Sequence, residues 1–243
     1  MHAQGDDLRL LLEVVRPNGG ERMLDVATGG GHTALHFAPH VREVVATDLT
    51  PRMLAAAEEH LRQAGASNVS FRLADAEALP FPDADFDLIT CRIAPHHFQH
   101  PVRFVSEAAR VLRPGGLFVL DDNMAPEDPE LEAFMNGFER QRDPSHVAAH
   151  PISRWRAWAE EAGLEVETAT GLTEKVYEFE SWTARQGMTA EEKAALEFSI
   201  LSGSERCRDY FQVTMGPDGH LASLSARFGI VSARKPSPDG DSV

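Results

Sequence analysis

Short apolar runs alternate with amphipathic stretches through the first two-thirds of the chain. Apolar runs of about four to eight residues indicate buried strands, and apolar residues that recur every three or four positions indicate helices. Strands are expected at residues 22–26, 41–47, 69–73, 86–91, 117–120, 164–168 and 226–233, and helices at 8–15, 33–37, 51–64, 102–112 and 152–162. The alternation is typical of βαβ units, so we predict an α/β fold with a doubly wound, mostly parallel seven-stranded sheet.

The alternation of predicted strands and helices becomes irregular after the fifth predicted strand. Residues 122–142 are polar and acidic, and residues 172–222 mix aromatic and polar residues without regular spacing. We expect one domain over residues 1–235, with 172–222 as a helical or irregular insertion. This insertion would form a lid that excludes water from a pocket, or else a homodimer contact or an extension of the core. Residues 236–243 are rich in Pro, Gly and Asp, which predicts a disordered tail.

Composition narrows the classes of partner. The chain of 243 residues has 38 acidic and 23 basic side chains, and its formal charge of -15 would repel nucleic acids and anionic lipid headgroups. Its two cysteines, Cys91 and Cys207, are too few for a disulfide framework, which favours a reducing, cytoplasmic location. The N-terminus shows no signal-peptide pattern, and no apolar run is long enough for a membrane span.

A glycine-rich turn follows the first predicted strand, in the segment LDVATGGGHTA that starts at Leu24. A strand that stops at such a turn and opens a helix presents backbone N–H groups to a ligand. The next strand ends at Asp48, where a carboxylate can accept hydrogen bonds from both hydroxyls of a ribose. The two features predict a nucleoside cofactor, and by themselves they suit NAD as well.

Three later segments complete a resemblance. They are LADAEALPF from Leu73, DFDLI from Asp85 and RVLRPGG from Arg110. Together with the glycine turn, they resemble the motifs of class I S-adenosylmethionine-dependent methyltransferases, above all the ubiquinone/menaquinone-biosynthesis type and its small-molecule relatives. The resemblance covers roughly residues 20–122, departs at Ala27 where the family usually has glycine, and implies S-adenosylmethionine as cofactor.

The resemblance also implies a set of cofactor-binding residues. In the family, the glycines let the backbone approach the methionine and ribose parts of the cofactor. Asp48 would hold the ribose, Asp75 would receive the adenine amino group, and the Ala76 N–H would bond a ring nitrogen. The full set is Asp25, Ala27, Gly29, Gly31, Asp48, Leu49, Met53, Asp75, Ala76, Cys91 and Arg92.

Histidines follow the fourth predicted strand, at the end of the sheet where ligands bind in open α/β folds. Methyl transfer is an in-line displacement that needs an aligned nucleophile and, for many acceptors, a base that removes its proton. His96 and His97 are the first candidates, because imidazole titrates near neutral pH. The alternative is that one caps the next helix and the other packs in the core.

A second cluster lies after the fifth predicted strand. His146 is a further catalytic candidate, and Arg142 and Asp143 would orient an anionic or hydroxylated substrate. An ordinary turn that starts at Asp143 explains the same residues without chemistry. His32, His36 and His40 are spaced by four, but Pro39 interrupts that helix and no acidic or cysteine partner lies nearby, so no metal site is expected.

These observations predict an S-adenosylmethionine-dependent methyltransferase that acts on an oxygen, nitrogen or carbon atom of a small molecule. Histidines favour an oxygen or nitrogen acceptor, and the motif wording favours carbon in a quinone-like ring. Two alternatives stay open: a protein that binds the cofactor without methyl transfer, and an NAD-dependent oxidoreductase. No nucleic-acid or membrane partner is expected.

Overall fold

The computed structural model describes residues 6–237. Its strands are β1 (Arg22–Val26), β2 (Glu43–Asp48), β3 (Val69–Leu73), β4 (Phe86–Arg92), β5 (Leu112–Asn123), β6 (Glu165–Glu178), β7 (Thr214–Met215) and β8 (Leu221–Arg234). Its helices are α1 (Asp6–Val15), α2 (His32–Phe37), α3 (Pro51–Gln63), α4 (Pro101–Val111), α5 (Pro129–Arg142), α6 (Ile152–Glu161), α7 (Phe179–Ala184), α8 (Ala190–Leu201) and α9 (Glu205–Tyr210), with short 3-10 turns at Ala38–His40 and Pro95–His97. No helix in this part of the chain is long and apolar enough to cross a bilayer.

The strands form one sheet in the order β3-β2-β1-β4-β5-β8-β6, with β7 paired to β8. Strands β1 to β5 are parallel, whereas β8 runs antiparallel to both β5 and β6. The strand order reverses between β1 and β4, so the crevice at their carboxyl ends is where a doubly wound sheet binds ligands. The predicted α/β class and mostly parallel sheet are confirmed.

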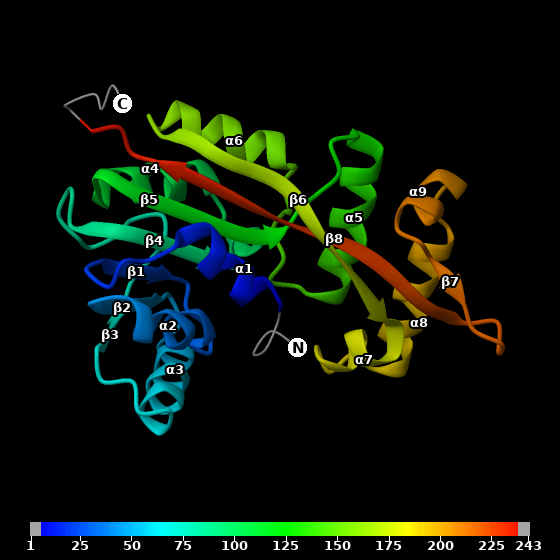
Figure 1. The fold of residues 1–243 in the computed structure, drawn as a ribbon. Coiled ribbons are helices and arrows are strands. Elements are labelled where there is room, and N and C mark those ends of the chain that lie inside the picture. Colours follow the sequence, from blue (N-terminus) through cyan, green and yellow to red (C-terminus); the bar gives the residue numbers. More distant parts are fainter. Residues whose placement is uncertain (1–5, 238–243) are drawn as a thin grey trace.

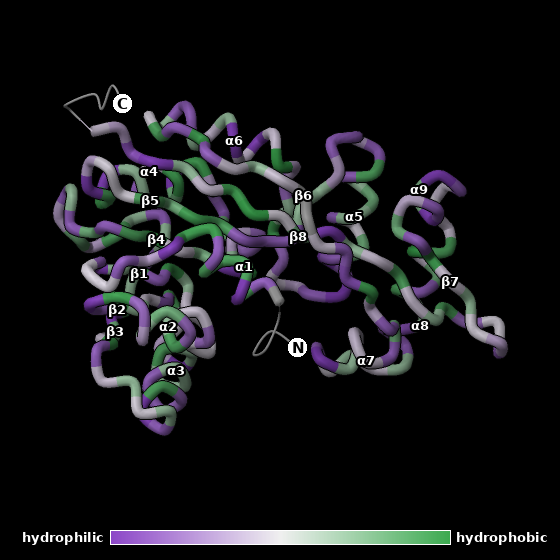
Figure 2. The backbone as a smooth tube through the Cα atoms, in the orientation of Figure 1, coloured by the Kyte–Doolittle hydropathy of each residue, from purple (hydrophilic) through white to green (hydrophobic). Residues whose placement is uncertain are grey.

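Alternation along the strands sends side chains into two separate layers. Leu24 and Ile89 face Phe104 of α4 and Trp155 of α6 on one side of the sheet. On the other side, Met23 and Leu88 pack with residues of α1, α2 and α3. Figure 2 shows the hydrophobic colouring along β4 and β5 in the middle of the sheet. Burial of each large apolar side chain contributes about 1.5–3 kcal/mol, which fixes the carboxyl ends of these strands.

The region after β5 differs from the prediction in three ways. An eighth strand, β7, joins the predicted seven. Strands β6 and β8 run well past the ends predicted for them, so the segment between them is 179–220 rather than 172–222, and it holds α7, α8 and α9 together with β7. We call residues 179–220 the cap. Helix α5 was missed because its exposed face is polar, although Asp128 caps it by accepting from the N–H groups of Glu130 and Leu131.

The cap has a hydrophobic core of its own. Phe138 of α5, Trp182 of α7, Leu196 of α8 and Phe211 pack with Phe228 of β8. Figure 1 shows β6 and β8 continuing beyond the parallel strands and carrying the cap helices at their far end. This places α5 and α7 beyond the carboxyl ends of β4 and β5, over the crevice. Of the tail predicted for 236–243, residues 238–243 lie outside the described part.

Candidate active site

The buried Asp25 side chain fixes the glycine turn. Its buried carboxylate accepts hydrogen bonds from the hydroxyls of Thr28 (2.6 Å) and Thr90 (2.8 Å). Burial raises the pKa of this carboxyl to about 6, against the opposing effect of the two hydroxyls. Asp25 therefore holds the turn to β4 from inside the protein, and its carboxylate does not line the cavities described below.

The turn itself depends on left-handed backbone. Gly29 has φ 54° and Gly31 has φ 78°, and Ala27 adopts φ 53° at the position where the family usually has glycine. Ala27 is therefore strained, because an L side chain costs about 1–2 kcal/mol in this conformation. A Cβ on Gly31 would lie 2.3 Å from Cδ1 of Leu61. Gly31 is thus needed both for the turn and for the close approach of α2 to α3.

Asp48, at the end of β2, is hydrogen-bonded to the glycine turn that follows β1. Its Oδ2 accepts from the Gly29 N–H at 3.0 Å, and its Oδ1 accepts from the Thr50 N–H at 2.9 Å. The carboxylate is thereby fixed at the rim of the glycine turn. The neighbouring Leu49 is 66% exposed and Met53 is 40% exposed, which is unusual for large apolar side chains and marks an apolar surface beside the acid.

A cavity of about 150 Å³ opens next to this rim. It is lined by Ala27, Leu49, Ala74, Asp75, Ala76, Glu77, His97, Phe98 and Gln99. Asp75 is held by accepting the Glu77 N–H at 2.9 Å. The apolar walls with an acid at one end suit a flat heteroaromatic ring that carries an amino group. Ala27, Leu49, Asp75 and Ala76, which the sequence predicted, meet here. Phe98 was missed.

A second cavity, of about 270 Å³, lies under the cap and shares His97 with the first. Its lining comes from the segment after β4, the end of β5, α5, the extended strands β6 and β8, and α7 with the residues after it. It consists of Ile93, His96, His97, Asn123, Glu139, Arg142, Asp143, Tyr177, Trp182, Arg185, Gln186 and Phe228. The predicted residues His96, His97, Arg142 and Asp143 all reach it. The shared wall at His97 makes the two cavities neighbours at the switch point of the sheet.

His96 is held by Asp122 of β5. The Asp122 carboxylate accepts from the His96 backbone N–H at 2.9 Å and pairs with Nδ1 of the ring at 2.7 Å. Burial opposes charge on His96, but the Asp122 carboxylate outweighs it and raises the pKa of the imidazole above its usual value of 6.5. Because Nδ1 is engaged, Nε2 is the ring nitrogen left for a ligand in the second cavity.

His97 and His146 differ from His96 in their surroundings. Nδ1 of His97 bonds the Ser145 carbonyl at 2.9 Å, and burial together with His96 lowers the pKa of His97. His146 stacks behind His96, with ring centroids 5.4 Å apart, and its Nε2 bonds the Asn136 amide oxygen at 2.8 Å. Burial lowers the pKa of His146 to about 3. His146 does not line either cavity, contrary to its predicted catalytic contact, because the Asn136 amide takes its Nε2.

Arg142 and Asp143 belong to a network that joins α5 to the cap. Arg142 pairs with the buried Glu139 at 2.9 Å, and its guanidinium lies 4.8 Å from the centre of the Trp182 ring. Asp143 accepts a hydrogen bond from the Gln186 amide at 2.6 Å. Asp122, Glu139, Trp182 and Gln186 were missed by sequence reasoning. Only Asp122 had a signal, since it lies two residues after a predicted strand whose carboxyl end faces the ligand crevice.

Cys91 and Arg92 lie deeper than predicted. Cys91 is 1% exposed within the core between β4 and α4, because alternation along β4 turns it away from the crevice. Arg92 is also buried, with Nε 3.7 Å from the Asp7 carboxylate of α1. Neither residue lines the two cavities. A direct contact of Cys91 with a cofactor is thus not compatible with this geometry.

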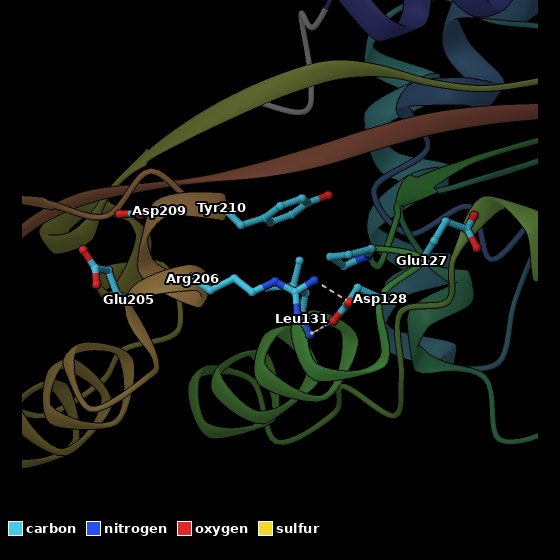
Figure 3. Close-up of a pocket in the computed structure, with 8 residues that line it drawn as sticks. Glu127, Asp128, Leu131, Glu205, Arg206, Asp209 and Tyr210 are labelled. Atoms are coloured by element: carbon cyan, nitrogen blue, oxygen red, sulfur yellow. Dashed lines mark hydrogen bonds and ion pairs between the residues drawn. The ribbon is translucent and has the colours of Figure 1, made fainter.

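A wider hollow of about 900 Å³ lies elsewhere, between the start of α5 and α9. Figure 3 shows Arg206 reaching from α9 to Asp128, and its guanidinium also pairs with Glu130 at 3.1 Å. These ion pairs attach the cap to α5. The hollow is separate from the histidines and from the glycine turn, so we assign it no role in the reaction.

Within residues 6–237, no group of three His, Cys, Asp or Glu side chains is arranged to hold a metal ion. The site defines an α/β protein of the Rossmann-like class with two adjoining cavities at the switch point of its sheet. Residues 24–120 match the methyltransferase domain family. The chain is 36% identical to the uncharacterized methyltransferase YcgJ of Bacillus subtilis (strain 168), over 96% of this chain and 92% of that protein.

Two further comparisons agree. The 27-O-demethylrifamycin SV methyltransferase of Amycolatopsis mediterranei (strain S699) is 32% identical over 89% of this chain and 78% of its own length. A solved structure from Bacillus halodurans C-125 is 42% identical and superposes with a TM-score of 0.92, covering 96% of this chain and 100% of that one. This chain belongs to the class I S-adenosylmethionine-dependent methyltransferase family and is an enzyme. The predicted family is confirmed, and the oxidoreductase and binding-only alternatives are wrong.

Proposed function

We propose that this enzyme transfers the methyl group of S-adenosylmethionine to an oxygen or nitrogen atom of a small molecule, with His96 as the base. The observation that carries the proposal is the His96–Asp122 pair at the wall of the second cavity, which adjoins the first cavity through His97. In this proposal the first cavity receives the adenine and the second receives the methyl acceptor.

The described residues fit the adenosyl part of the cofactor. Asp48 sits at the rim of the glycine turn, where its carboxylate would accept from the ribose hydroxyls. Leu49 and Phe98 would enclose the adenine, and Asp75 would accept from its amino group. Met53 lies beside the glycine turn, with its Cε 3.8 Å from the position of a Cβ on Gly29, and would contact the cofactor from there.

Bound S-adenosylmethionine supplies a methyl group on a cationic sulfur, which makes that methyl electrophilic. The protein's task is to align the acceptor and remove its proton. His96 is suited to this task because Asp122 fixes its ring and stabilises the imidazolium that forms. His97 would sit between acceptor and cofactor as a neutral ring. His146 would support His96 from behind as a positioning residue.

The second cavity also suggests the character of the acceptor. Trp182 and Tyr177 stack with ring centroids 5.4 Å apart, which gives the cavity an aromatic wall. Glu139 is paired with Arg142, so the acidic and basic side chains largely offset one another. We infer a small acceptor with an apolar body and a hydroxyl or amine. The relative from Amycolatopsis mediterranei is named for methyl transfer to an oxygen, which agrees with a base-assisted reaction.

The cap would act as the lid over this cavity, since Trp182 and Gln186 both come from it. A homodimer contact through the cap and a cytoplasmic location remain predictions from the sequence.

The test is an isotope-tracing experiment. The protein would be incubated with S-adenosylmethionine labelled in its methyl group and a broad panel of phenols, alcohols, amines and quinols, and labelled products would be identified by mass spectrometry. His96→Gln and Asp122→Asn should lower kcat by roughly 10²–10⁴-fold while the affinity for S-adenosylhomocysteine stays within twofold or so. Full activity of His96→Gln, or a label found only on carbon, would refute the assignment of the base.

A further inference from the structure

The side chain of Asn123, the last residue of β5, is buried at the wall of the second cavity. Asn123 is 6% exposed and lines that cavity. Within residues 6–237, its Oδ1 atom accepts no hydrogen bond. A buried amide oxygen without a donor is destabilising, because it gives up its hydrogen bonds to water and gains none in the protein. Such an oxygen at a cavity wall points to a ligand that donates a hydrogen bond to it.

Glu139 of α5 adds a second acceptor to the same cavity. Its side chain is buried, and it pairs with Arg142 through Nε and Nη2, each at 2.9 Å. Both of these contacts fall on Oε2 of the carboxylate. Oε1 therefore keeps its capacity to accept a hydrogen bond from a ligand. Two acceptor oxygens at one cavity, on Asn123 and Glu139, favour a ligand that is rich in donors.

The end of β5 separates Asn123 from the proposed base. Consecutive side chains of a strand point to opposite faces of the sheet. Asp122 holds His96 on one face, so Asn123 projects from the other face, beside Phe228, its register partner on β8. His96, Asn123 and Phe228 all line the same cavity. The cavity therefore passes around the end of β5, and a ligand with one group at His96 can place a second group at Asn123.

The charges at this cavity favour a neutral donor. Besides its histidines, the wall holds two acids, Glu139 and Asp143, and two arginines, Arg142 and Arg185. Arg142 pairs with Glu139, and its Nη2 lies 4.0 Å from Oδ2 of Asp143. These acidic and basic side chains offset one another, so the wall offers little net attraction to an ion. A ligand carboxylate would also face the acceptor oxygens and be repelled, whereas a hydroxyl would donate to them.

We propose that the methyl acceptor carries a second hydroxyl, whose O–H donates to Oδ1 of Asn123, and that Asn123 selects such diol-type acceptors. The assignment rests on the proposed function, in which the reacting hydroxyl lies at Nε2 of His96. The stacked rings of Tyr177 and Trp182 would contact the body of the acceptor between its two hydroxyls. A site that bonds a hydroxyl rejects the analogue without it, because the buried oxygen of the site is then left unpaired.

The test compares phenol with catechol, resorcinol and hydroquinone as ligands of the enzyme saturated with S-adenosylhomocysteine. Phenol has one O–H donor, and the three benzenediols have two at different spacings. Ligand-observed NMR gives the four dissociation constants. At least one benzenediol should bind more tightly than phenol by about tenfold or more. In Asn123→Leu, which removes the acceptor oxygen, the ratio of the two affinities should fall below about twofold.

Thermal unfolding separates this role from a structural one. Because Oδ1 of Asn123 has no donor to lose, Asn123→Leu should unfold at the same temperature as the unmodified protein or at a higher one. Asn68→Leu is the matched control. Nδ2 of Asn68 donates to the carbonyls of Ala38 at 2.8 Å and Val41 at 3.2 Å, so this variant should lose at least about 2 °C in Tm and keep the preference for the benzenediol. Asn123→Ala decides the affinity ratio in the same way if Asn123→Leu does not fold.

The outcomes separate this inference from the proposed function. The diol site is overturned if no benzenediol binds the unmodified protein more tightly than phenol, or if the preference survives in the Asn123 variant. A fall in Tm as large as that of Asn68→Leu in both Asn123 variants would mark a structural asparagine and overturn it too. Each of these results leaves the proposed function standing, since an acceptor with one hydroxyl or amine satisfies it. If the unmodified protein does not bind S-adenosylhomocysteine, the proposed function fails, and this inference fails with it.

Discussion

The two halves of the site are built in different ways. On the proposed cofactor side, the backbone determines the geometry, because the glycine turn and the rim at Asp48 are fixed by φ values and by N–H groups donated to one carboxylate. On the proposed acceptor side, side chains from distant segments meet, such as His96 with Asp122 and Asp143 with Gln186. A backbone site tolerates few substitutions at its turns, whereas a side-chain site can change its specificity residue by residue.

The largest effect should come from Asp48→Ala. The variant removes a charged acceptor for two ribose hydroxyls, each worth about 1.5–3 kcal/mol, so the affinity for S-adenosylhomocysteine should fall by at least roughly 100-fold. Calorimetry measures this directly. Trp182→Phe, which alters only the acceptor side, is the control and should bind the cofactor product as the unmodified protein does. Equal losses in both variants would mean that the two halves are not separable.

Gly31→Ala should follow in size. The added Cβ meets Leu61 at 2.3 Å, and the residue must keep φ 78°. We expect the free energy of unfolding to fall by about 2–4 kcal/mol, from overpacking and backbone strain together. Gly65→Ala is the matched control, because Gly65 has φ 77° with nothing within 4 Å of its Cβ position, and it should lose only about 1 kcal/mol. Denaturant titration of both variants separates the effect of the contact with Leu61 from that of the backbone strain. Equal losses of unfolding free energy in the two variants would show that this contact has no effect.

The pH dependence tests the acceptor side. His96 acts as a base only when neutral, and Asp122 raises its pKa above 6.5, so kcat/KM should fall about tenfold per pH unit below that pKa. Because the folded state raises the pKa of His96, the His96–Asp122 pair stabilises the fold at pH values below the ordinary histidine pKa. That contribution is lost as the pH rises through the raised pKa, so stability and activity should change in opposite directions with pH. Asp122→Asn should move the acidic limb of the profile to lower pH. A profile without an acidic limb would contradict the role of His96.

Ala27→Gly should have the smallest effect. Glycine relieves the strain at φ 53° but makes the unfolded chain more flexible, so stability should rise by no more than about 1 kcal/mol. Thermal unfolding of the variant and the unmodified protein shows whether the stability rises or falls. A clear loss of stability would show that the methyl group of Ala27 packs usefully in the first cavity, where it forms part of the wall.

The contrast between the halves also explains what the sequence could predict. Strands β1 to β4, the glycine turn and the acid at Asp48 are local patterns, and each was predicted close to its observed position. Of β5 only the middle was predicted, at 117–120 within Leu112–Asn123. Asp75 and Ala76 lie just after β3, and their role in cofactor binding stays a prediction from the family resemblance. Such features are visible in one segment at a time, because the backbone conformation depends on neighbouring residues.

The residue contacts on the proposed acceptor side could not be predicted from single segments of the sequence. Asp122 lies 26 residues from His96, and Gln186 lies 43 residues from Asp143, so each pair exists only after folding. His146 illustrates the converse error, since its position beside Asp143 in the chain suggested a contact with substrate, but Asn136 holds it behind His96. Cys91 was misplaced because the alternation of β4 turns it into the core.

The most direct test of the account is a crystal structure with S-adenosylhomocysteine bound. We predict the adenine between Leu49 and Phe98 with its amino group on Asp75, the ribose on Asp48, and the sulfur facing the second cavity past His97. An adenosyl group bound in the hollow near Arg206, or one whose sulfur faces away from His96 and His97, would contradict the assignment of both cavities.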